Sequence, residues 1–510
     1  MSKTYDAIIV GAGHNGLVAA VYLAMAGKKV LMFESTREVG GATTSVKAFP
    51  EYEANLSRYA YLVSLFPDKI LKDLDLKFTT LSRPMSSYTP YLLNGRPAGL
   101  RISRKWDADT EDSFSLMEGG RTEAKTWRWF YGGMETLAKR LSPTLLEPLP
   151  TRTELRSHVG MDDIWRMVFD RPIGETLLEK FHSDLVRGII LTDGVIGTHT
   201  SAFDLQANRC LLYHLMGNGN GEWKVPKGGM GALIGELKQK AVRLGVEIRT
   251  NSRVVNIHTQ ASHAEVHLDD ESTYRTQHIL CNAAPQVLAK LMGKEPPTCR
   301  EGSQLKINLL LDKLPRFKSG FPATLGFSGT LHINETMSEL ERAFEDTRQG
   351  KLPRTLPFEM YCHTLTDPSI LSKELQFGGY HTLTMFALHT PASLFRSDNR
   401  ETCRTLMRQA FTALNEHLEA PIESCIAKST DGEPCIEIKS PMDLEGAIGL
   451  PKGNIFHKDL SFPFMENKIE HRWGVETEDP RIMICGSGAV RGGGVSGIPG
   501  HNAAMKLLGK

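Results

Sequence analysis

The sequence lacks the spacings and the charge excess that mark several classes of protein. Its eight cysteines include no CxxC pair, which argues against a zinc site or a disulfide framework and is typical of a reducing compartment. Its 17 histidines include no HExxH or similar ligand motif, so no metal site is predicted. Basic residues number 60 and acidic residues 59, and this balance gives no reason to expect a nucleic-acid partner.

Long hydrophobic runs are also absent. No stretch approaches the roughly 18 apolar residues of a membrane span, although 41% of the 510 residues are hydrophobic. Met1 to Tyr5 directly precede the first expected strand, so we expect neither a signal peptide nor a transit peptide. We therefore expect a cytoplasmic chain of two or three domains, with peripheral contact rather than insertion where it meets a membrane.

What the chain does carry is a nucleotide-binding motif near its start. An apolar strand is expected at Ala7 to Val10, a helix at Leu17 to Ala26 and a second apolar strand at Val30 to Phe33. The turn before the helix consists of Gly11, Ala12, Gly13, His14, Asn15 and Gly16. In such a turn the first glycine permits a tight bend, the second lets the backbone approach a pyrophosphate, and the third lets helix and strand pack closely. The phosphates then lie on free N–H groups at the positive end of the helix.

An acid after the second strand narrows the choice of dinucleotide. Glu34 lies where a carboxylate can accept both hydroxyls of an adenosine ribose. Its charge disfavours NADP, whose 2′-phosphate it would repel, and leaves NAD and FAD. Ser35 to Val39 then lead into Gly40, Gly41 and Ala42, and this second glycine pair lets the chain pass close to an extended cofactor. The same arrangement occurs in flavoproteins, so FAD is favoured.

Two later segments have the pattern expected for the rest of a cofactor domain. Residues 217–285 combine a glycine-marked loop, a helix with one apolar face and short strands near 246–248, 254–257, 264–268 and 278–281. Further on, an apolar strand at 481–485 leads into a glycine-rich loop and a helix at 503–508. So many glycines between a strand and a helix indicate that the backbone approaches something flat or phosphorylated.

Together these segments resemble the phytoene desaturase-related FAD oxidoreductases. The resemblance rests on the 11–16 turn with its distal acid, on W-x-V-P-K-G-G-M-G-A-L at 223–233, on G-L-P-K-G-N-I-F-H at 449–457, and on C-G-S-G-x-x-x-G-G-G-V-x-G-x-P-G-x-N-A-A at 485–504. It is strongest with the branch that holds pyridine nucleotide-disulfide oxidoreductase domain-containing protein 2. The chain departs from the pattern at Val490 and Arg491, where members usually carry His-Pro.

The resemblance implies a fold and a set of cofactor contacts. The fold class is α/β, a Rossmann-like FAD-binding domain of the amine oxidase/phytoene desaturase superfamily type with an inserted α+β substrate domain. Residues 1–73, 216–300 and 446–510 are expected to form the discontinuous FAD-binding domain, and 74–215 with 301–445 the substrate or cap domain. The residues expected to bind FAD are Gly11, Ala12, Gly13, His14, Asn15, Gly16, Glu34, Ser35, Gly40, Gly41, Ala42, Val254, Gly486, Gly488, Gly494 and Val495.

Periodicity in the other half of the chain predicts its main elements. Helices are expected at 122–145, 161–190 and 401–418, strands at 305–311 and 380–389, and a hairpin turn at 95–97. Aromatic and methionine residues at helical spacing there are interpreted chiefly as core, and some are expected to line an apolar tunnel.

The resemblance also implies a function. It is that of an FAD-dependent oxidoreductase, of the kind that acts on carotenoids, which transfers hydride between the flavin and an apolar polyene, isoprenoid or lipid-like substrate. The alternatives are a flavin amine oxidase of the same fold and a flavin-binding regulatory protein with little turnover. His199, His214 and His457 lie near glycine-rich segments, but no catalytic residue is assigned, because the flavin does most of the chemistry. Cys485 lies in an apolar strand, so a buried thiol is expected rather than a covalent flavin link. Oligomeric state and electron acceptor stay open.

Overall fold

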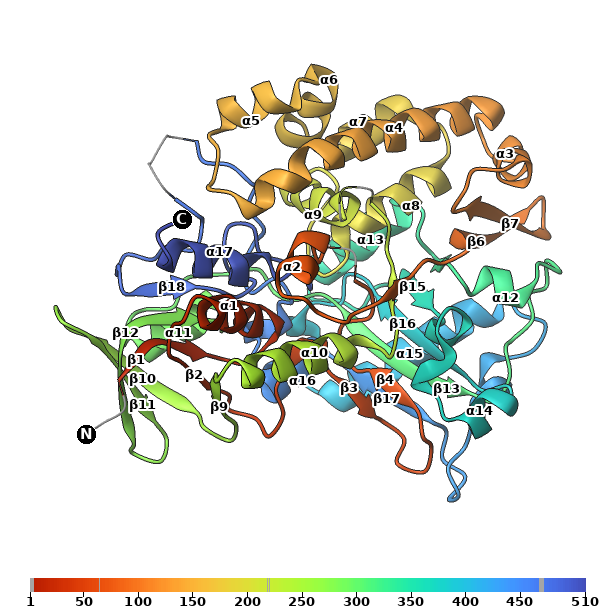
Figure 1. The fold of residues 1–510 in the computed structure, drawn as a ribbon. Coiled ribbons are helices and arrows are strands. Elements are labelled where there is room, and N and C mark those ends of the chain that lie inside the picture. Colours follow the sequence, from red (N-terminus) through yellow and green to blue (C-terminus); the bar gives the residue numbers. More distant parts are fainter. Residues whose placement is uncertain (1–3, 64, 218, 220, 467–471) are drawn as a thin grey trace.

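A computed structural model describes residues 4–63, 65–217, 219, 221–466 and 472–510 of the protein. Figure 1 shows three parts: a first sheet with its helices at the lower left, a second sheet at the lower right, and a layer of helices above them. Among the described residues, no helix has the length and apolar character needed to cross a membrane.

The first sheet is built around parallel strands that are buried on both faces. Its order is β10-β11-β12-β1-β2-β9, with β18 beside the end of β12. Strands β9, β2, β1, β12 and β18 run parallel, and β10 and β11 form an antiparallel extension on β12. The strands are β1 (Tyr5–Val10), β2 (Val30–Phe33), β9 (Glu247–Arg249), β10 (Val254–Thr259), β11 (Ala264–Leu268), β12 (Thr273–Cys281) and β18 (Ile482–Ile484).

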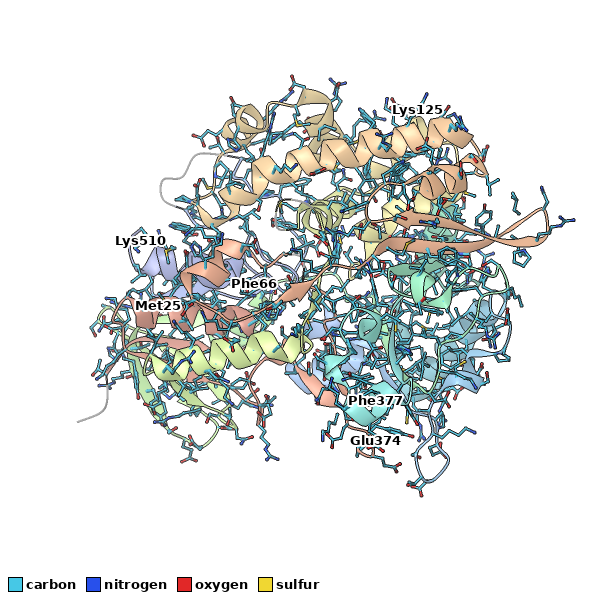
Figure 2. All side chains as sticks on the ribbon, turned by 45° about the vertical axis from the view of Figure 1, so that its right-hand side comes forward. Met25, Phe66, Lys125, Glu374, Phe377 and Lys510 are labelled. Atoms are coloured by element: carbon cyan, nitrogen blue, oxygen red, sulfur yellow. The ribbon has the colours of Figure 1, made fainter. Side chains whose placement is uncertain are left out.

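Helices from distant parts of the chain cover this sheet. They are α1 (His14–Met25), α2 (Asp68–Asp73), α10 (Met230–Arg243), α11 (Pro285–Leu291) and α17 (Ile498–Leu507). Helix α10 has the one apolar face that the sequence predicts, and its Leu233, Leu237 and Ala241 are buried in a core shared with α1 and α17. Phe66, labelled in Figure 2, belongs to the same core, and a Cβ on Gly497 would come within 2.9 Å of its ring.

The second sheet has one apolar face and one polar face. Its order is β17-β13-β16-β15-β14-β6-β7, antiparallel except for the β14–β6 pair. Alternate residues pack against Leu406, Ala410 and Leu414 of α15, as the period of two in a strand requires. The elements are β6 (Met85–Leu93), β7 (Arg96–Ser103), β13 (Leu305–Leu311), β14 (Thr330–Ile333), β15 (Phe358–Tyr361), β16 (His381–Ala387), β17 (Ile436–Lys439) and α15 (Asn399–Asn415).

The third part is a layer of helices, most of which follow β7 in the sequence. It comprises α3 (Ala108–Ser115), α4 (Gly120–Leu141), α5 (Arg152–Val159), α6 (Asp162–Trp165), α7 (Ile173–Lys180), α8 (Asp184–Val195), α9 (Leu205–Met216) and α13 (Met337–Arg348). The helix predicted at 161–190 was wrong as one element, because the chain is divided into α6, a π-helical turn, α7 and α8. Pro172 disfavours helical backbone at Arg171, which is extended.

Short elements complete the chain. They are β3 (Ser45–Lys47), β4 (Asn55–Ser57), β5 (Thr80–Leu81), β8 (Val225–Pro226), α12 (Ala323–Gly326), α14 (Lys373–Phe377) and α16 (Pro441–Ile448). Figure 2 shows Phe377 and Glu374 on the outside of the second sheet, where the Phe377 side chain is exposed.

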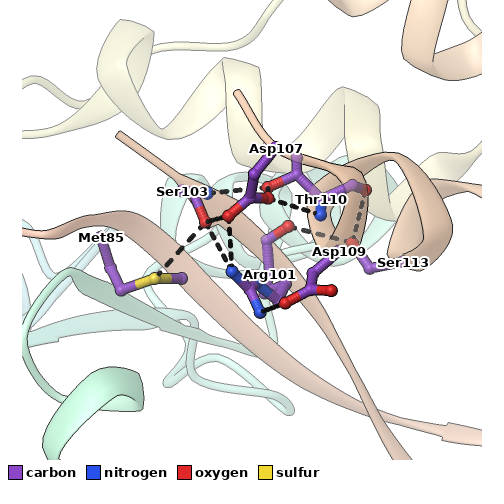
Figure 3. Close-up of polar contacts among 7 residues, drawn as sticks. All are labelled: Met85, Arg101, Ser103, Asp107, Asp109, Thr110 and Ser113. Atoms are coloured by element: carbon purple, nitrogen blue, oxygen red, sulfur yellow. Dashed lines mark hydrogen bonds and ion pairs between the residues drawn. The ribbon is translucent and has the colours of Figure 1, made fainter. Parts of the chain in front are cut away.

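A polar network fixes the turn between β7 and α3. The Asp107 carboxylate accepts the Thr110 N–H at 2.8 Å, which caps α3, and also accepts the Ser103 hydroxyl and an Arg101 N–H. Figure 3 shows these groups converging from the strand and the helix. Because Trp106 lies inside this turn, the network also fixes one wall of the cavity described next.

Candidate active site

A cavity of about 1020 Å³ lies between the two sheets and the helical layer. Its wall begins at the turn between β1 and α1, continues past the glycine loop after β18, and reaches the polar face of the second sheet and helices α4, α8 and α9. The cavity therefore joins the predicted nucleotide-binding residues to residues of the second sheet and the helical layer.

Most of the residues predicted to bind the cofactor lie on this wall. Those that line it are Gly11, Gly13, His14, Asn15, Glu34, Ser35, Gly40, Gly41, Ala42, Val254, Gly494 and Val495. The others, Ala12, Gly16, Gly486 and Gly488, lie behind it. A Cβ on Gly16 would come within 2.5 Å of the Gly11 carbonyl oxygen, and one on Gly486 would overlap the Asn282 carbonyl. These two glycines permit close backbone packing.

The turn itself has the conformation that brings backbone close to a ligand. Gly11 has a φ of +93°, which L-residues with a Cβ rarely adopt. A Cβ on Gly13 would come within 2.8 Å of Nδ2, the side-chain nitrogen of Asn282. Helix α1 begins directly after Gly13, has no acid in its first turn, and so presents N–H groups and the positive end of its dipole to the cavity.

Glu34 is held at the end of β2, and one of its two oxygens keeps a free acceptor site. Its Oε1 accepts the Thr36 N–H at 2.9 Å, the Thr36 hydroxyl at 3.0 Å and the Ser35 hydroxyl at 3.4 Å, whereas its Oε2 accepts only the Ala12 N–H at 2.9 Å. Because each carboxylate oxygen has about two acceptor sites, Oε2 can accept one more hydrogen bond, and Glu34 lines the cavity. The arrangement leaves room for a ligand hydroxyl and fits an adenosine ribose.

Several buried polar atoms along this wall lack protein partners. Within the described part of the chain, His14 Nε2, Asn15 Oδ1 and His457 Nδ1 are buried without a hydrogen bond. Buried polar groups are normally paired, so these atoms indicate that a polar ligand belongs here. Together with Gly41 and Gly494, which also line the cavity and have positive φ, they fit a dinucleotide.

Arg491, where the chain departs from the family pattern, lies outside the cavity wall. Arg491 is 2% exposed and donates to the carbonyl oxygens of Thr144 at 2.8 Å, Glu147 at 2.5 Å and Trp473 at 2.9 Å. Burial lowers the pKa of its guanidinium to about 10, so it stays charged at neutral pH. Arg491 thus ties the glycine loop to the chain after α4.

The strand register places a row of functional side chains on the polar face of the second sheet. His332 lies opposite Glu359, Glu359 opposite Phe386, and Phe386 opposite Lys306. Tyr361, two residues after Glu359, faces the same way. All five line the cavity.

Lys306 is the buried amine of this row. Its Nζ donates to the Ser57 carbonyl oxygen at 2.6 Å and lies 5.0 Å from the centre of the Phe386 ring. Burial lowers its pKa to about 7, so near neutral pH the amine is present in both its charged and its neutral form.

Acidic groups gather at the other end of the row. Glu359 accepts the Tyr361 hydroxyl at 2.6 Å, and His332 Nδ1 lies 2.5 Å from Glu335 Oε2. Asp193 of α8 and Arg83, which donates to the Thr330 hydroxyl, complete this part of the wall.

Apolar and aromatic side chains from several segments form much of the rest of the wall, which is called the apolar chamber below. They are Trp127 and Tyr131 of α4, Ile189 of α8, Leu215 of α9, and Leu65, Ile102, Trp106, Ile196, Ile455 and Phe456 of other segments. Arg128, Glu135 and Asp193 of α4 and α8 also line the cavity. The cavity thus combines an apolar chamber with a short polar row, and a mainly charged lining is not observed among the described residues.

The histidines singled out in the sequence occupy different places. His457 and His214 line the cavity, and burial lowers the pKa of each to about 4. His214 is hydrogen-bonded through Nδ1 to the Cys210 carbonyl oxygen and stacks on Trp223. His199 is not part of the cavity wall, and its Nε2 pairs with the Thr347 hydroxyl. Cys485 is fully buried in the core, as expected.

Sequence reasoning missed the row on the second sheet. A signal was present, because Lys306 interrupts an apolar strand and Glu359 stands between Phe358 and Met360. A charged residue inside a buried strand indicates a function or a partner. Which of these residues meet depends on strand register, which the sequence does not state.

Comparisons with known proteins agree with this geometry. The chain matches the flavin containing amine oxidoreductase family over residues 16–411. An uncharacterized protein of Mycobacterium tuberculosis is 40% identical over 528 residues, which cover 99% of this chain and 97% of that protein. Pyridine nucleotide-disulfide oxidoreductase domain-containing protein 2 of Mus musculus is 30% identical over 561 residues, covering 99% and 93%.

Two further proteins match at lower sequence identity. Hydroxyneurosporene desaturase of Cereibacter sphaeroides is 25% identical over 303 residues, which cover 57% of this chain and 58% of the desaturase. The solved structure of a putrescine oxidase bound to putrescine superposes with a TM-score of 0.60 at 17% identity, covering 100% of both chains.

These matches confirm the predicted family resemblance and the predicted fold class. The match over most of the chain, the full-length relatives and a cavity wall that fits a dinucleotide lead to one conclusion. The chain belongs to the flavin containing amine oxidoreductase family, and its cofactor is FAD.

Proposed function

We propose that the protein is an FAD-dependent oxidoreductase that transfers hydride to or from an apolar polyene, isoprenoid or lipid-like substrate. The observation that carries the proposal is that one and the same cavity is lined by the nucleotide-binding turn and by the apolar chamber beside α4, α8 and α9. The partial similarity to hydroxyneurosporene desaturase supports the substrate class. In this proposal residues 1–73, 216–300 and 446–510 hold the cofactor, and 74–215 with 301–445 hold the substrate.

The chain's own residues would bind and orient FAD. The first turn of α1 and Gly13 would hold the pyrophosphate, Glu34 the adenosine ribose, and the loop with Gly494 and Val495 the ring end. When bound, the flavin accepts or donates two electrons as hydride. The apolar chamber would exclude water and hold the reacting carbon, and Lys306 could hold or release a proton beside it.

Amine oxidation is a second candidate, and one observation favours it. A buried lysine and a pair of tyrosines, Tyr61 and Tyr361, share the cavity wall, and such groups are expected of an amine oxidase. However, the two rings touch each other, with centres 4.8 Å apart and planes at 35°, so no substrate fits between them. We therefore place the apolar substrate first.

Peripheral contact with membranes belongs to the same proposal, because an apolar substrate is dissolved in a bilayer. Flotation of the FAD-loaded protein with liposomes, at low and at high salt, tests it. Flotation that persists at high salt is expected, whereas protein that stays unbound at both salt concentrations contradicts this part of the proposal.

The reaction is tested by anaerobic mixing of FAD-loaded protein with polyenes and isoprenoids, and separately with primary amines. Loss of the visible flavin band with the first group supports the proposal, and loss with amines alone overturns it. A variant sharpens the test, because Gly132 lines the cavity and a Cβ there meets nothing within 4 Å. Gly132→Phe should slow reduction at least about tenfold, or about 1.4 kcal/mol, with FAD content unchanged.

A matched control is available on α10. A Cβ on Gly235 also meets nothing within 4 Å, and Gly235 lies outside the cavity wall. Gly235→Phe should therefore leave the rate of flavin reduction unchanged. Equal rates in Gly132→Phe and wild type would mean that the substrate does not use this chamber.

A further inference from the structure

The acidic end of the row on the second sheet is a built arrangement rather than a chance cluster. Antiparallel pairing of β14 with β15 sets His332 directly opposite Glu359, and such pairs bring their side chains together on one face. Tyr361 follows on the same face, and Asp193 approaches from α8 across the cavity wall. Atoms of His332, Glu335 and Glu359 lie within 4.8 Å of one another, and all three residues are buried.

Hydrogen bonds orient the carboxyl groups. Glu359 Oε1 accepts the Tyr361 hydroxyl at 2.6 Å, which fixes one oxygen of the carboxyl group. Behind it, Glu335 Oε2 and His332 Nδ1 are 2.5 Å apart. The remaining oxygen, Glu335 Oε1, is buried with no hydrogen-bond partner in the described ranges. A buried carboxyl group with an unpaired oxygen is more stable in its neutral, protonated form.

Charge balance gives the same result. The titratable and charged groups that surround Glu359 are His332, Glu335, Tyr361, Asp193, Arg83 and, further along the row, Lys306. Three carboxyl groups therefore share one permanent cation, the Arg83 guanidinium. Buried carboxylates so close together cannot all stay ionised, so protons must be held among them.

The pKa shifts follow from this environment. Burial, with the charge of Glu335 adding to it, raises the pKa of Glu359 to about 8. Burial raises the pKa of Asp193 to about 6 and that of Glu335 well above its usual range, and it lowers the pKa of His332. Glu359 thus titrates near the pH at which enzymes work, which is the property of an efficient acid–base group.

We propose that Glu359 is the acid–base catalytic residue of the reaction in this cavity, and that Tyr361, His332 and Glu335 position it. The inference rests on the proposed function. In substrate oxidation one C–H bond gives up its electron pair with hydrogen as hydride to FAD, the oxidant. The proton of the neighbouring C–H bond goes to a Glu359 carboxylate oxygen, and the electrons of that bond form the new double bond. Saturation of a double bond is the reverse, with Glu359 as the proton donor.

The same three residues could instead bind a divalent cation, since one histidine and two carboxylates are common ligands. The hydrogen bonds of Glu359 with Tyr361 and of Glu335 with His332 favour shared protons, because they already occupy an oxygen or nitrogen of each residue. Metal analysis of the purified protein separates the two. About one tightly bound divalent ion per chain, retained in the variant Glu374→Gln of the exposed Glu374 and lost in Glu359→Gln, would overturn the proposal.

The kinetic test is a pH profile of anaerobic flavin reduction by substrate. Oxidation needs the Glu359 carboxylate, so the wild-type rate should rise with pH through about 8. Glu359→Gln should be slower by about 10²–10⁴-fold and lose this rise. Tyr361→Phe removes a hydrogen bond that favours the carboxylate, so the rise should move to higher pH. A profile unchanged in Glu359→Gln, or lost in Asp193→Asn alone, would overturn the assignment.

A control and a substrate-free readout complete the experiment. Glu374 of α14 is exposed and lies outside the cavity wall, so Glu374→Gln should keep the wild-type profile. Infrared spectra of FAD-loaded protein without substrate give a second readout. In wild type, a band of a protonated carboxyl group should disappear as the pH rises through about 8, and Glu359→Gln should lack this change. Absence of that band from wild type overturns the inference. If the band behaves as expected in wild type and in Glu359→Gln but no substrate reduces the flavin, the proposed function is wrong and the proton-holding role of Glu359 is not.

Discussion

At the residue scale, Glu34 has a structural role and is proposed to have a binding role. Through the Ala12 N–H it holds the nucleotide-binding turn against the end of β2, and its Oε2 keeps one acceptor site for a ligand in the cavity that it lines. This double use explains how a carboxylate that is only 9% exposed can stay paired before and after the ribose binds.

Substitution of Glu34 tests its binding role. Hydrogen bonds to a charged group contribute about 1.5–3 kcal/mol, so Glu34→Ala should weaken FAD affinity by about one to two powers of ten. At saturating FAD the rate of flavin reduction should stay near that of wild type, because the ribose lies far from the reacting ring. Titration of apoprotein with FAD and single-turnover reduction measure the two effects. An unchanged dissociation constant would mean that the proposed role of Glu34 is wrong.

Lys306 links burial to the pH dependence of stability. Burial lowers its pKa to about 7 in the folded protein, whereas the unfolded chain keeps the proton up to about pH 10.4. Between these values the unfolded state binds more protons, so the contribution of Lys306 to folding becomes more favourable as pH rises. Lys306→Met removes the cost of burying this amine, so its unfolding free energy should exceed that of wild type by more at pH 7 than at pH 10. The difference between the two offsets should be about 3 kcal/mol.

Denaturant unfolding at the two pH values measures this difference. The exposed Lys313 provides the control, and Lys313→Met should show the same offset from wild type at both. A pH-independent offset for Lys306→Met would mean that the amine keeps its proton in the folded protein.

The residues that the sequence predicted and those it missed differ in how they come together. Gly11, Gly13 and Glu34 belong to one strand–helix–strand unit, so their spacing alone indicates their arrangement. The row from His332 to Lys306 depends on the pairing of four strands separated by many residues. Strand register is set by packing and turn geometry across the whole sheet, and no local pattern encodes it.

At the element scale, periodicity predicted regular segments well and interrupted ones poorly. Strand β11 begins and ends where the sequence predicted. The hairpin expected at 95–97 joins β6 to β7, but its turn consists of Asn94 and Gly95, and Arg96 and Pro97 already belong to β7. By contrast, the apolar spacing over 161–190 gave no warning of the breaks at Arg171 and at Phe181, both of which are extended. Helical spacing reports the buried face, whereas breaks depend on individual residues such as Pro172.

The close packing of α1 and α17 gives a prediction at this scale. A Cβ on Gly500 of α17 would overlap the Asn15 carbonyl oxygen and lie 3.1 Å from the Ala19 nitrogen. Gly500→Ala should therefore push the helices apart, cost about 1–3 kcal/mol of unfolding free energy, and weaken FAD binding through the displaced turn. Urea unfolding and FAD titration measure both. In Gly235→Ala, where space is open, neither quantity should fall, and equal behaviour of the two variants would contradict the packing account.

At the scale of the whole molecule, parts of the chain that are far apart in the sequence meet around one cavity. The turn after β1, the wall from the second sheet and helical layer, and the glycine loop after β18 each supply part of its surface. The sequence predicted that the first and last would meet at a cofactor. It did not reveal that the polar row would share their cavity, because this depends on how the two sheets pack.

The central claim is that this cavity holds one FAD, bound without a covalent link, and its most direct test is quantification of flavin after acid precipitation. We expect about one FAD per chain in the supernatant and a colourless pellet, because Cys485 is buried in the core, away from the cavity wall. A pellet that stays yellow would show a covalent link. A colourless protein that ignores added FAD but binds NAD would contradict the account as a whole.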